Sequence, residues 1–267
     1  MGALFKKEVS QFFSSITGYL SIILFLVANG LLLFVFPDTS IFNDGYATLD
    51  TLFRLAPWIL LLLLPAATMR LFAEEWRSGT MELLLTRPLS EWQIVGGKYL
   101  SGLFLLIFAL IPTVIYYITI RSLAVSPADV DTGGIIGSYI GLFLLGSVFT
   151  AIGIWASSVS SQTVVAFLLS VFTCFIVYTG FDALSRIPAF AGGLDYYLQL
   201  IGIQYHYVSI SRGVIGLQDI VYFFSMDGLF LYLAKLSLDK RKWEKAGVLA
   251  GPGDLSEQTG IKHPVVE

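Results

Sequence analysis

Six stretches of the sequence are mainly apolar over the length that a helix needs to cross a bilayer, and they constrain the fold most strongly. We expect spans at 19–36, 53–72, 99–120, 135–156, 164–180 and 220–238. About 20 apolar residues make a helix as long as the hydrocarbon core is thick. Only 13% of the residues are charged, about half the share found in soluble domains. The sequence therefore predicts an all-α, polytopic membrane protein with six transmembrane helices.

The segment before the first span has a different pattern. Apolar residues recur at helical spacing, and charged or polar residues fall largely between them. The apolar set is Phe5, Val9, Phe12, Phe13 and Ile16, and the polar set is Lys6, Lys7, Glu8 and Gln11. We predict an amphipathic helix over residues 1–18 that lies in the membrane interface. The alternative is that these residues simply begin the first span.

The basic residues are distributed unevenly between the two ends of the predicted spans. If the N-terminus is cytoplasmic, the cytoplasmic side holds Lys6, Lys7, Arg70, Arg77, Arg87, Lys98, Lys240, Arg241, Lys242, Lys245 and Lys262. The other side holds only Arg54, Arg121, Arg186 and Arg212, together with eight aspartates. The positive-inside rule then places both termini, and the connection at 71–98, in the cytoplasm.

Two further segments complete the organisation of the chain. Residues 181–219 are apolar and rich in tyrosine, which is typical of a membrane interface, so we expect short external helices that re-enter the outer leaflet. We expect His206, within this segment, to be a polar residue that faces the interface rather than a ligand. Residues 246–267 include "GPGD" and show no periodicity, which predicts a flexible cytoplasmic tail.

The sequence lacks the motifs of an energy-converting or catalytic site. No G-x-x-x-x-G-K-[ST] phosphate loop is present, because Trp92 stands where Gly97-Lys98 would need a glycine and Tyr99 follows the lysine. With two histidines and one cysteine, Cys174, we expect neither a metal nor another cofactor. The net charge of −3 gives no reason to expect nucleic acid. We therefore predict that the chain is not an enzyme.

Asp227 lies inside the last predicted span, and it leaves an ion-coupled carrier as an alternative function. Ionisable groups within spans often belong to ion or proton pathways. Asp227 is either such a site in an ion-coupled carrier or a carboxylate with a structural partner. The other ionisable residue of this span, Lys235, lies near its cytoplasmic end, where its side chain can reach the interface.

The connection "LFAEEWRSGTMELLLTRPLSEWQIVGGK", residues 71–98, is charged and amphipathic. We predict a helix in which Glu74 and Arg77 can meet across one turn, and a break at Ser78-Gly79-Thr80. A short second helix, with its leucines against the protein or a partner, should end at Pro88 because a proline disfavours helix in the residue before it. A third helix should start at Ser90. Such a segment fits a docking surface for a separate motor protein, or, alternatively, for a cytosolic partner of a membrane scaffold without transport.

This connection resembles the cytoplasmic loop of type-2 ABC transporter permeases. The matching positions are Glu75, Gly79, Thr80, Glu82, Leu84, Leu85, Pro88, Ser90, Gly97 and Lys98. In that family the loop contains the coupling helix, which docks in a groove of the nucleotide-binding subunit. The resemblance implies a permease domain over 19–245 in a bacterial inner membrane, an ABC ATPase partner that holds ATP and Mg, and a second permease copy or homologue. The implied ATPase-coupling residues are Glu74, Glu75, Arg77, Gly79, Thr80, Glu82, Leu84 and Pro88.

A narrower resemblance concerns residues 42–76 and 205–223. These segments are similar to the permease subunit of the gliding-motility-associated (Gld) ABC transporter of Bacteroidota, which works with a second membrane subunit that has a large external domain. The resemblance implies a part in gliding-motility machinery. The alternative within the family is an exporter of lipid, polysaccharide or drug, since the shared loop does not separate these substrates.

Overall fold

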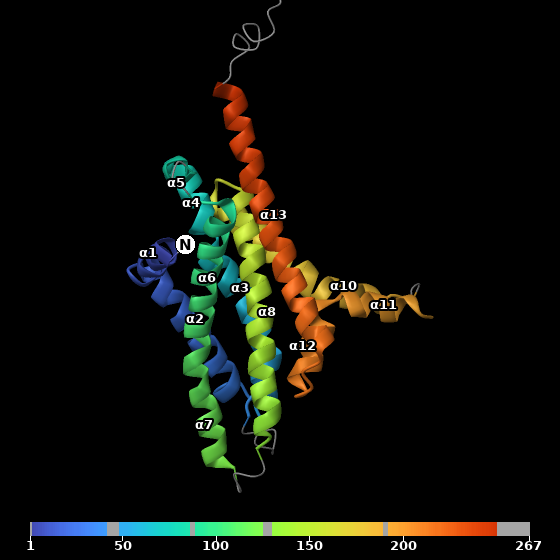
Figure 1. Cartoon of the computed structure of the whole chain (residues 1–267). Coiled ribbons are helices and arrows are strands. Elements are labelled where there is room, and N and C mark those ends of the chain that lie inside the picture. The colour runs from blue at the N-terminus through green and yellow to red at the C-terminus, as the bar shows by residue number, and fades with distance from the viewer. Residues whose placement is uncertain (1, 42–47, 86–88, 125–129, 189–191, 250–267) are drawn as a thin grey trace, which may run out of the picture.

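The computed structural model describes residues 2–41, 48–85, 89–124, 130–188 and 192–249, and the regular elements in these ranges are helices (Figure 1). The first half of the chain contains α1 (Gly2–Phe13), α2 (Ile16–Phe34), α3 (Asp50–Thr68), α4 (Arg70–Ser78), α5 (Thr80–Leu85), α6 (Glu91–Leu110), η1 (Ile111–Thr113) and α7 (Val114–Leu123). The second half contains α8 (Thr132–Val159), α9 (Thr163–Phe175), η3 (Ile176–Gly180), α10 (Phe181–Ser185), α11 (Leu194–Ile201), α12 (Ile203–Ser211) and α13 (Leu217–Leu249).

Five helical runs are long and apolar enough to cross a membrane. They are Asp50–Ser78, Glu91–Leu123, Thr132–Val159, Thr163–Ser185 and Leu217–Lys242, and each contains one of the predicted spans. A sixth span is obtained if α1 and α2, which are bent by 66° relative to each other, are taken together. The prediction of an all-α, polytopic membrane protein is therefore confirmed.

Helix α8 forms the axis of the bundle (Figure 1). It packs against α3, α6, α9, α12 and α13. Most residues of its apolar stretch are buried inside the protein. Small residues allow this close packing, as is common between membrane helices. At Gly153, an added Cβ atom would lie 1.9 Å from the Thr68 hydroxyl oxygen of α3. The contact between α3 and α8 therefore requires the absence of a side chain at this position.

Helix α1 turns away from α2, as the predicted interfacial helix would, but one of its charged residues is placed differently from our expectation. Glu8 was grouped with the polar face, yet only 6% of it is exposed. It lies on the buried side together with Leu4 because its carboxylate meets a buried lysine of α6. Lys6 and Lys7 remain exposed.

The segment predicted to form short helices contains α10, α11 and α12, and α10 and α11 project sideways from the bundle (Figure 1). The expectation that His206 faces the interface is wrong, because only 5% of it is exposed. Its Nδ1 atom lies 2.7 Å from an Asp219 carboxylate oxygen, and its Nε2 atom lies 2.9 Å from the carbonyl oxygen of Leu200. The buried carboxylate of Asp219, at the start of α13, holds the ring inside and joins α12 to the last span.

Helix α13 continues beyond the last predicted span to Leu249. The first four residues of the predicted tail are therefore helical, because the helix that begins in the last span runs on through the charged residues after it. The rest of the tail, 250–267, lies outside the described residues.

Candidate functional site

The candidate site starts where α3 ends and α4 begins, at Met69. The hydroxyl of Ser157, from α8, accepts hydrogen bonds from the backbone N–H groups of Phe72 and Ala73 at 2.9 and 3.1 Å. It also donates to the carbonyl of Met69 at 3.0 Å. The first N–H groups of a helix have no partner within that helix. Ser157 supplies one from a neighbouring helix, and so fixes the start of α4 to the axis of the bundle.

The far end of α4 is a glycine turn, as the sequence predicts. Gly79 has a φ of 72°, and its N–H donates to the carbonyl of Trp76. This left-handed conformation is easily adopted only by glycine. The hydroxyls of Ser78 and Thr80 lie 2.9 Å apart across the turn, and α5 starts at Thr80.

Helix α5 rests on a small core at this end of the bundle. Met81 is fully buried among Leu4, Phe72, Ile94, Val95, Ile154, Ala234 and Leu238, and Leu84 packs partly buried against them. Leu84 thus faces the protein, one of the two orientations the sequence left open. The helix that contains Glu82 is described but the side chain of Glu82 is not, and Pro88 lies outside the described residues.

The next helix begins as predicted. Ser90 caps α6: its hydroxyl accepts from the N–H of Gln93, and the Gln93 side chain accepts from the N–H of Ser90. This reciprocal pair is a capping box. Glu91 follows in the first turn and pairs with Lys242 of α13 at 3.1 Å.

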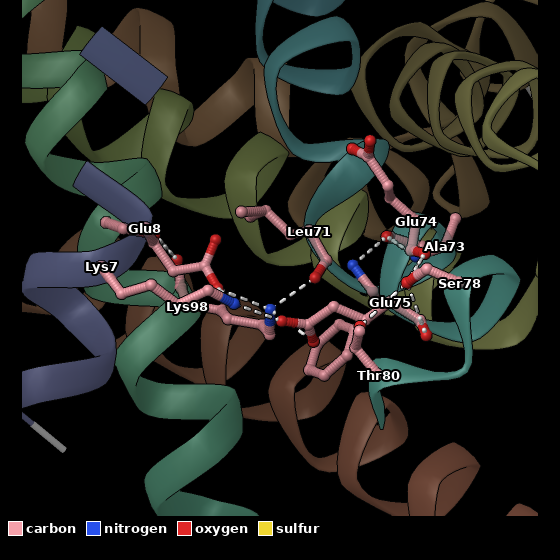
Figure 2. Close-up of polar contacts among 12 residues, drawn as sticks. Lys7, Glu8, Leu71, Ala73, Glu74, Glu75, Ser78, Thr80 and Lys98 are labelled. Atoms are coloured by element: carbon pink, nitrogen blue, oxygen red, sulfur yellow. Dashed lines mark hydrogen bonds and ion pairs between the residues drawn. The ribbon is translucent and has the colours of Figure 1, made fainter. Parts of the chain in front are cut away.

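A cluster of four charged residues joins α4 to α1 and α6 (Figure 2). Lys98 of α6 has no exposed side-chain surface, and its Nζ atom lies 2.9 Å from Glu8 of α1 and 2.9 Å from Glu75 of α4. The same Nζ atom donates to the carbonyl of Leu71. Lys7 completes the cluster, with its Nζ atom 2.8 Å from Glu75. We call Lys7, Glu8, Glu75 and Lys98 the four-residue ion cluster.

The ion cluster is balanced, with two ammonium and two carboxylate groups. Lys98 also lies 4.9 Å from the centre of the Phe72 ring, a cation–π contact. Partial burial of Lys7 acts against its charge, but the hydrogen bond and charge of Glu75, with Glu8, raise the pKa of Lys7 above its usual value. A buried pair of this kind holds its elements in one arrangement, because separating the partners leaves an uncompensated charge.

The predicted coupling residues therefore divide into two groups. Glu74, Arg77, Gly79 and Thr80 lie exposed on α4 and its turn, and no ion pair joins Glu74 to Arg77 or to any other described residue. Glu75 points inward, with 13% of its side chain exposed. The first group offers a surface to a partner, whereas Glu75 fastens that surface to the bundle.

Three residues that hold α4 were not assigned to the site from the sequence. Glu8 and Ser157 gave no usable signal, because a glutamate in an amphipathic helix and a serine near the end of a span are ordinary. Lys98 matches the permease loop pattern but was not among the implied coupling residues. A lysine at the edge of an apolar run is costly to bury without an acidic partner, and this is the one sequence signal that pointed to the cluster.

Asp227, the other candidate, is buried in α13. Its Oδ2 atom accepts a hydrogen bond from the Ser147 hydroxyl of α8 at 2.8 Å. Within the described ranges, no three His, Cys, Asp or Glu residues are grouped closely enough to hold a metal ion. Asp227 thus has the structural partner that the sequence left open.

One family of known proteins matches most of the chain. The family model described as "ABC-2 family transporter protein" matches residues 6–193, which is more than half of the chain. The chain belongs to the ABC-2 transporter family. This permease is thus a membrane component of an ABC transporter and not itself the catalytic subunit, and the family implies an ABC ATPase partner. The match includes the four residues of the ion cluster and ends before α11. No curated protein matches the permease.

Proposed function

We propose that this permease is the transmembrane subunit of an ATP-driven transporter whose ATPase docks on the exposed surface of α4 and α5. That surface consists of Glu74, Arg77, Gly79 and Thr80. The observation that supports it most directly is the ion cluster, because a docking surface can transmit a movement only if it is fastened to the spans. Lys98 connects α4 to α6, the pair of Lys7 with Glu75 connects it to α1, and Ser157 connects it to α8.

The end of the bundle that contains α4 and α5 is the cytoplasmic end in this proposal. The basic residues of α1, α4 and the C-terminal part of α13 gather there, as the positive-inside rule requires. Both termini then lie in the cytoplasm of a bacterial inner membrane. A cytosolic ATPase would meet α5 and the projecting end of α13 first (Figure 1).

The mechanism follows from how α4 is held. An ATPase that binds two conformations of the permease with different affinity shifts the equilibrium between them. Because packed helices move as units, a displacement of α4 would carry α1, α6 and α8 with it. One chain forms half of a pathway, so a second copy or a homologue would face it across the membrane.

The proposed biological setting is gliding-motility machinery, with a second membrane subunit that has a large external domain. The support for this is the similarity of residues 42–76 and 205–223 to that group of permeases. In such a machine the permease could pass force to external subunits rather than move a solute. ATP-dependent flux of a defined solute in liposomes would contradict the force-transmitting role.

The docking proposal is tested by copurification of the full chain with its partner ABC ATPase from the same cells. Arg77→Glu and Glu74→Lys each reverse one exposed charge without touching the ion cluster. We expect each variant to insert and to keep the wild-type thermal midpoint, while ATPase recovery falls at least about tenfold, or about 1.4 kcal/mol of binding free energy.

Arg121→Glu is the matched control, because Arg121 is an exposed arginine in the last turn of α7 at the opposite end of the bundle. It should leave ATPase recovery unchanged. Normal recovery of the ATPase by both α4 variants would show that this surface is not the docking site.

A further inference from the structure

A polar notch lies beside α12, in a part of the molecule that the proposed function does not use. It is formed where α10, α11 and α12 meet, and it has a volume of about 490 Å³. The polar side chains on its walls include those of Asp182, Arg186, Gln199, Gln204, Tyr205 and Arg212. The notch is half open, so its contents can exchange with the surroundings.

The notch has an excess of positive charge. Arg186 pairs with Asp182 at 2.8 Å, and 74% of the Arg186 side chain stays exposed. Arg212 is exposed and forms no ion pair with any acid in the described part of the chain. Asp219 does not line the notch and forms no ion pair with Arg212, and its two carboxylate oxygens lie against His206 and Ser209. Two arginines therefore face one aspartate.

The surroundings of the notch are apolar. Leu194, Tyr197 and Ile201 are exposed on α11, and Val214 and Leu217 are exposed after α12. On a membrane protein such a surface meets lipid. A guanidinium group among lipid-facing side chains is stable only where it reaches water or an anion. The phosphate of a phospholipid head is an anion that every bilayer presents next to apolar chains.

We propose that the notch binds the phosphate-bearing head of a phospholipid. Arg212 and the free edge of Arg186 would take the phosphate oxygens, because the planar guanidinium group donates two parallel hydrogen bonds to such an anion. The side-chain amides of Gln199 and Gln204 both donate and accept, and so suit the hydroxyl or ammonium groups of the head. The acyl chains would lie along the exposed apolar side of α11. The volume lies within the roughly 300–1,000 Å³ of small-molecule sites.

The test is a titration of the purified full chain in detergent with phosphatidylglycerol, followed by native mass spectrometry. The wild type is compared with the Arg186→Gln/Arg212→Gln double variant. We expect the wild type to retain a lipid whose apparent affinity falls at least tenfold in the double variant. Arg121→Gln removes one exposed arginine outside the notch and should bind as the wild type does.

Two further probes identify what is recognised. Diacylglycerol has the same chains without phosphate, so it should show no dependence on the two arginines. Inorganic phosphate has the charge without chains, so it should displace phosphatidylglycerol only at far higher concentration. Arg212→Lys keeps the charge and should retain part of the affinity.

Several outcomes would overturn the proposal. One is equal lipid retention by the wild type and the double variant, and another is no retained lipid in the wild type. Arginine-dependent binding of diacylglycerol would exclude phosphate recognition, and inorganic phosphate binding as tightly as the lipid would make the notch a site for soluble phosphate. If the double variant has a lower thermal midpoint without lipid, Arg212→Gln alone decides between these outcomes, because Arg212 forms no ion pair with the described residues that this variant would lose.

Discussion

At the scale of single residues, Lys98 shows what the candidate site demands of the sequence. Its side chain is fully buried, so the water that an ammonium group loses must be replaced by protein groups. The carboxylates of Glu8 and Glu75 and the carbonyl of Leu71 do this. Three segments that are distant in the sequence thus depend on one side chain.

Replacing Lys98 by methionine should destabilise the protein strongly. Lys98→Met keeps much of the packing but leaves two poorly exposed carboxylates facing each other with only Lys7 to compensate. Breaking a buried pair in this way costs about 3–5 kcal/mol. Thermal or denaturant unfolding in detergent measures the loss.

Lys7→Met is the control for this prediction, since it removes the same group from the same cluster at a position where 51% of the side chain is exposed. Exposed pairs contribute about 0–1 kcal/mol. Equal losses in the two variants would contradict the central role of Lys98.

Glycine is required at position 79 because of the backbone conformation there, and not because a side chain would lack space. A Cβ atom there would meet nothing within 4 Å, but the φ of 72° is unfavourable for other residues. Gly79→Ala should therefore lower the free energy of unfolding by about 1–2 kcal/mol, and Gly79→Asn by less. Unfolding experiments on both variants check this.

Gly228→Ala is a matched comparison for Gly79. Gly228 also has nothing within 4 Å of an added Cβ atom, but it lies inside α13 without a positive φ. Alanine is favoured over glycine within a helix by about 1 kcal/mol, so this substitution should be neutral or stabilising. If Gly79→Ala were equally harmless, the turn would not require glycine.

At the scale of elements, the position of α4 depends on the hydrogen bonds that its first turn makes to Ser157 of α8. Ser157→Ala should leave the N–H groups of Phe72 and Ala73 buried without a partner, which costs about 1–3 kcal/mol. The effect should be local, because the rest of α8 keeps its packing. Hydrogen exchange of these two amides should therefore accelerate before global stability is lost.

Ser158→Ala provides the control one residue further along α8. Ser158 is equally buried, but its hydroxyl donates to the carbonyl of Trp155 in its own helix rather than to α4. It should not change the exchange of Phe72 and Ala73. Similar acceleration in both variants would mean that Ser157 does not anchor α4.

At the scale of the whole molecule, the arrangement of spans depends on close contacts along α8. An alanine at position 153 would place its Cβ atom 1.9 Å from the hydroxyl oxygen of Thr68 and 2.9 Å from its Cβ atom. The two helices must then separate, because the Cβ atom of Thr68 is fixed by the backbone of α3 and cannot rotate away from the new Cβ atom. Overpacking of this kind costs about 1–3 kcal/mol.

Gly153→Ala should therefore lower the thermal midpoint and loosen α3 against α8, which a spin-label distance between the two helices would show. The double variant Gly153→Ala/Thr68→Ala removes the clashing hydroxyl and should recover part of the loss. A Gly153→Ala variant as stable as the wild type would show that α3 and α8 do not need this contact.

Much of the fold could be predicted from local patterns. The spans, the break at Gly79, and the start of α6 at Ser90 depend on residues within a few positions of each other. Apolar runs of sufficient length, a glycine, and a serine followed by glutamine at the third position each have a direct local cause. The inward position of Glu75 has none, because on a helical pattern it is indistinguishable from its exposed neighbour Glu74.

The sequence by itself thus determined the class of the protein, its helices, and the segment that separates the second and third membrane-spanning runs. The tertiary structure alone decided which charges on that segment are internal and which are free, and it brought Arg186 and Arg212 to one notch. The physical reason is the distance along the chain over which each effect acts. Hydrophobic length and turn conformation act along the chain, whereas the partner of a buried charge is chosen by packing, here between residues 8, 75 and 98.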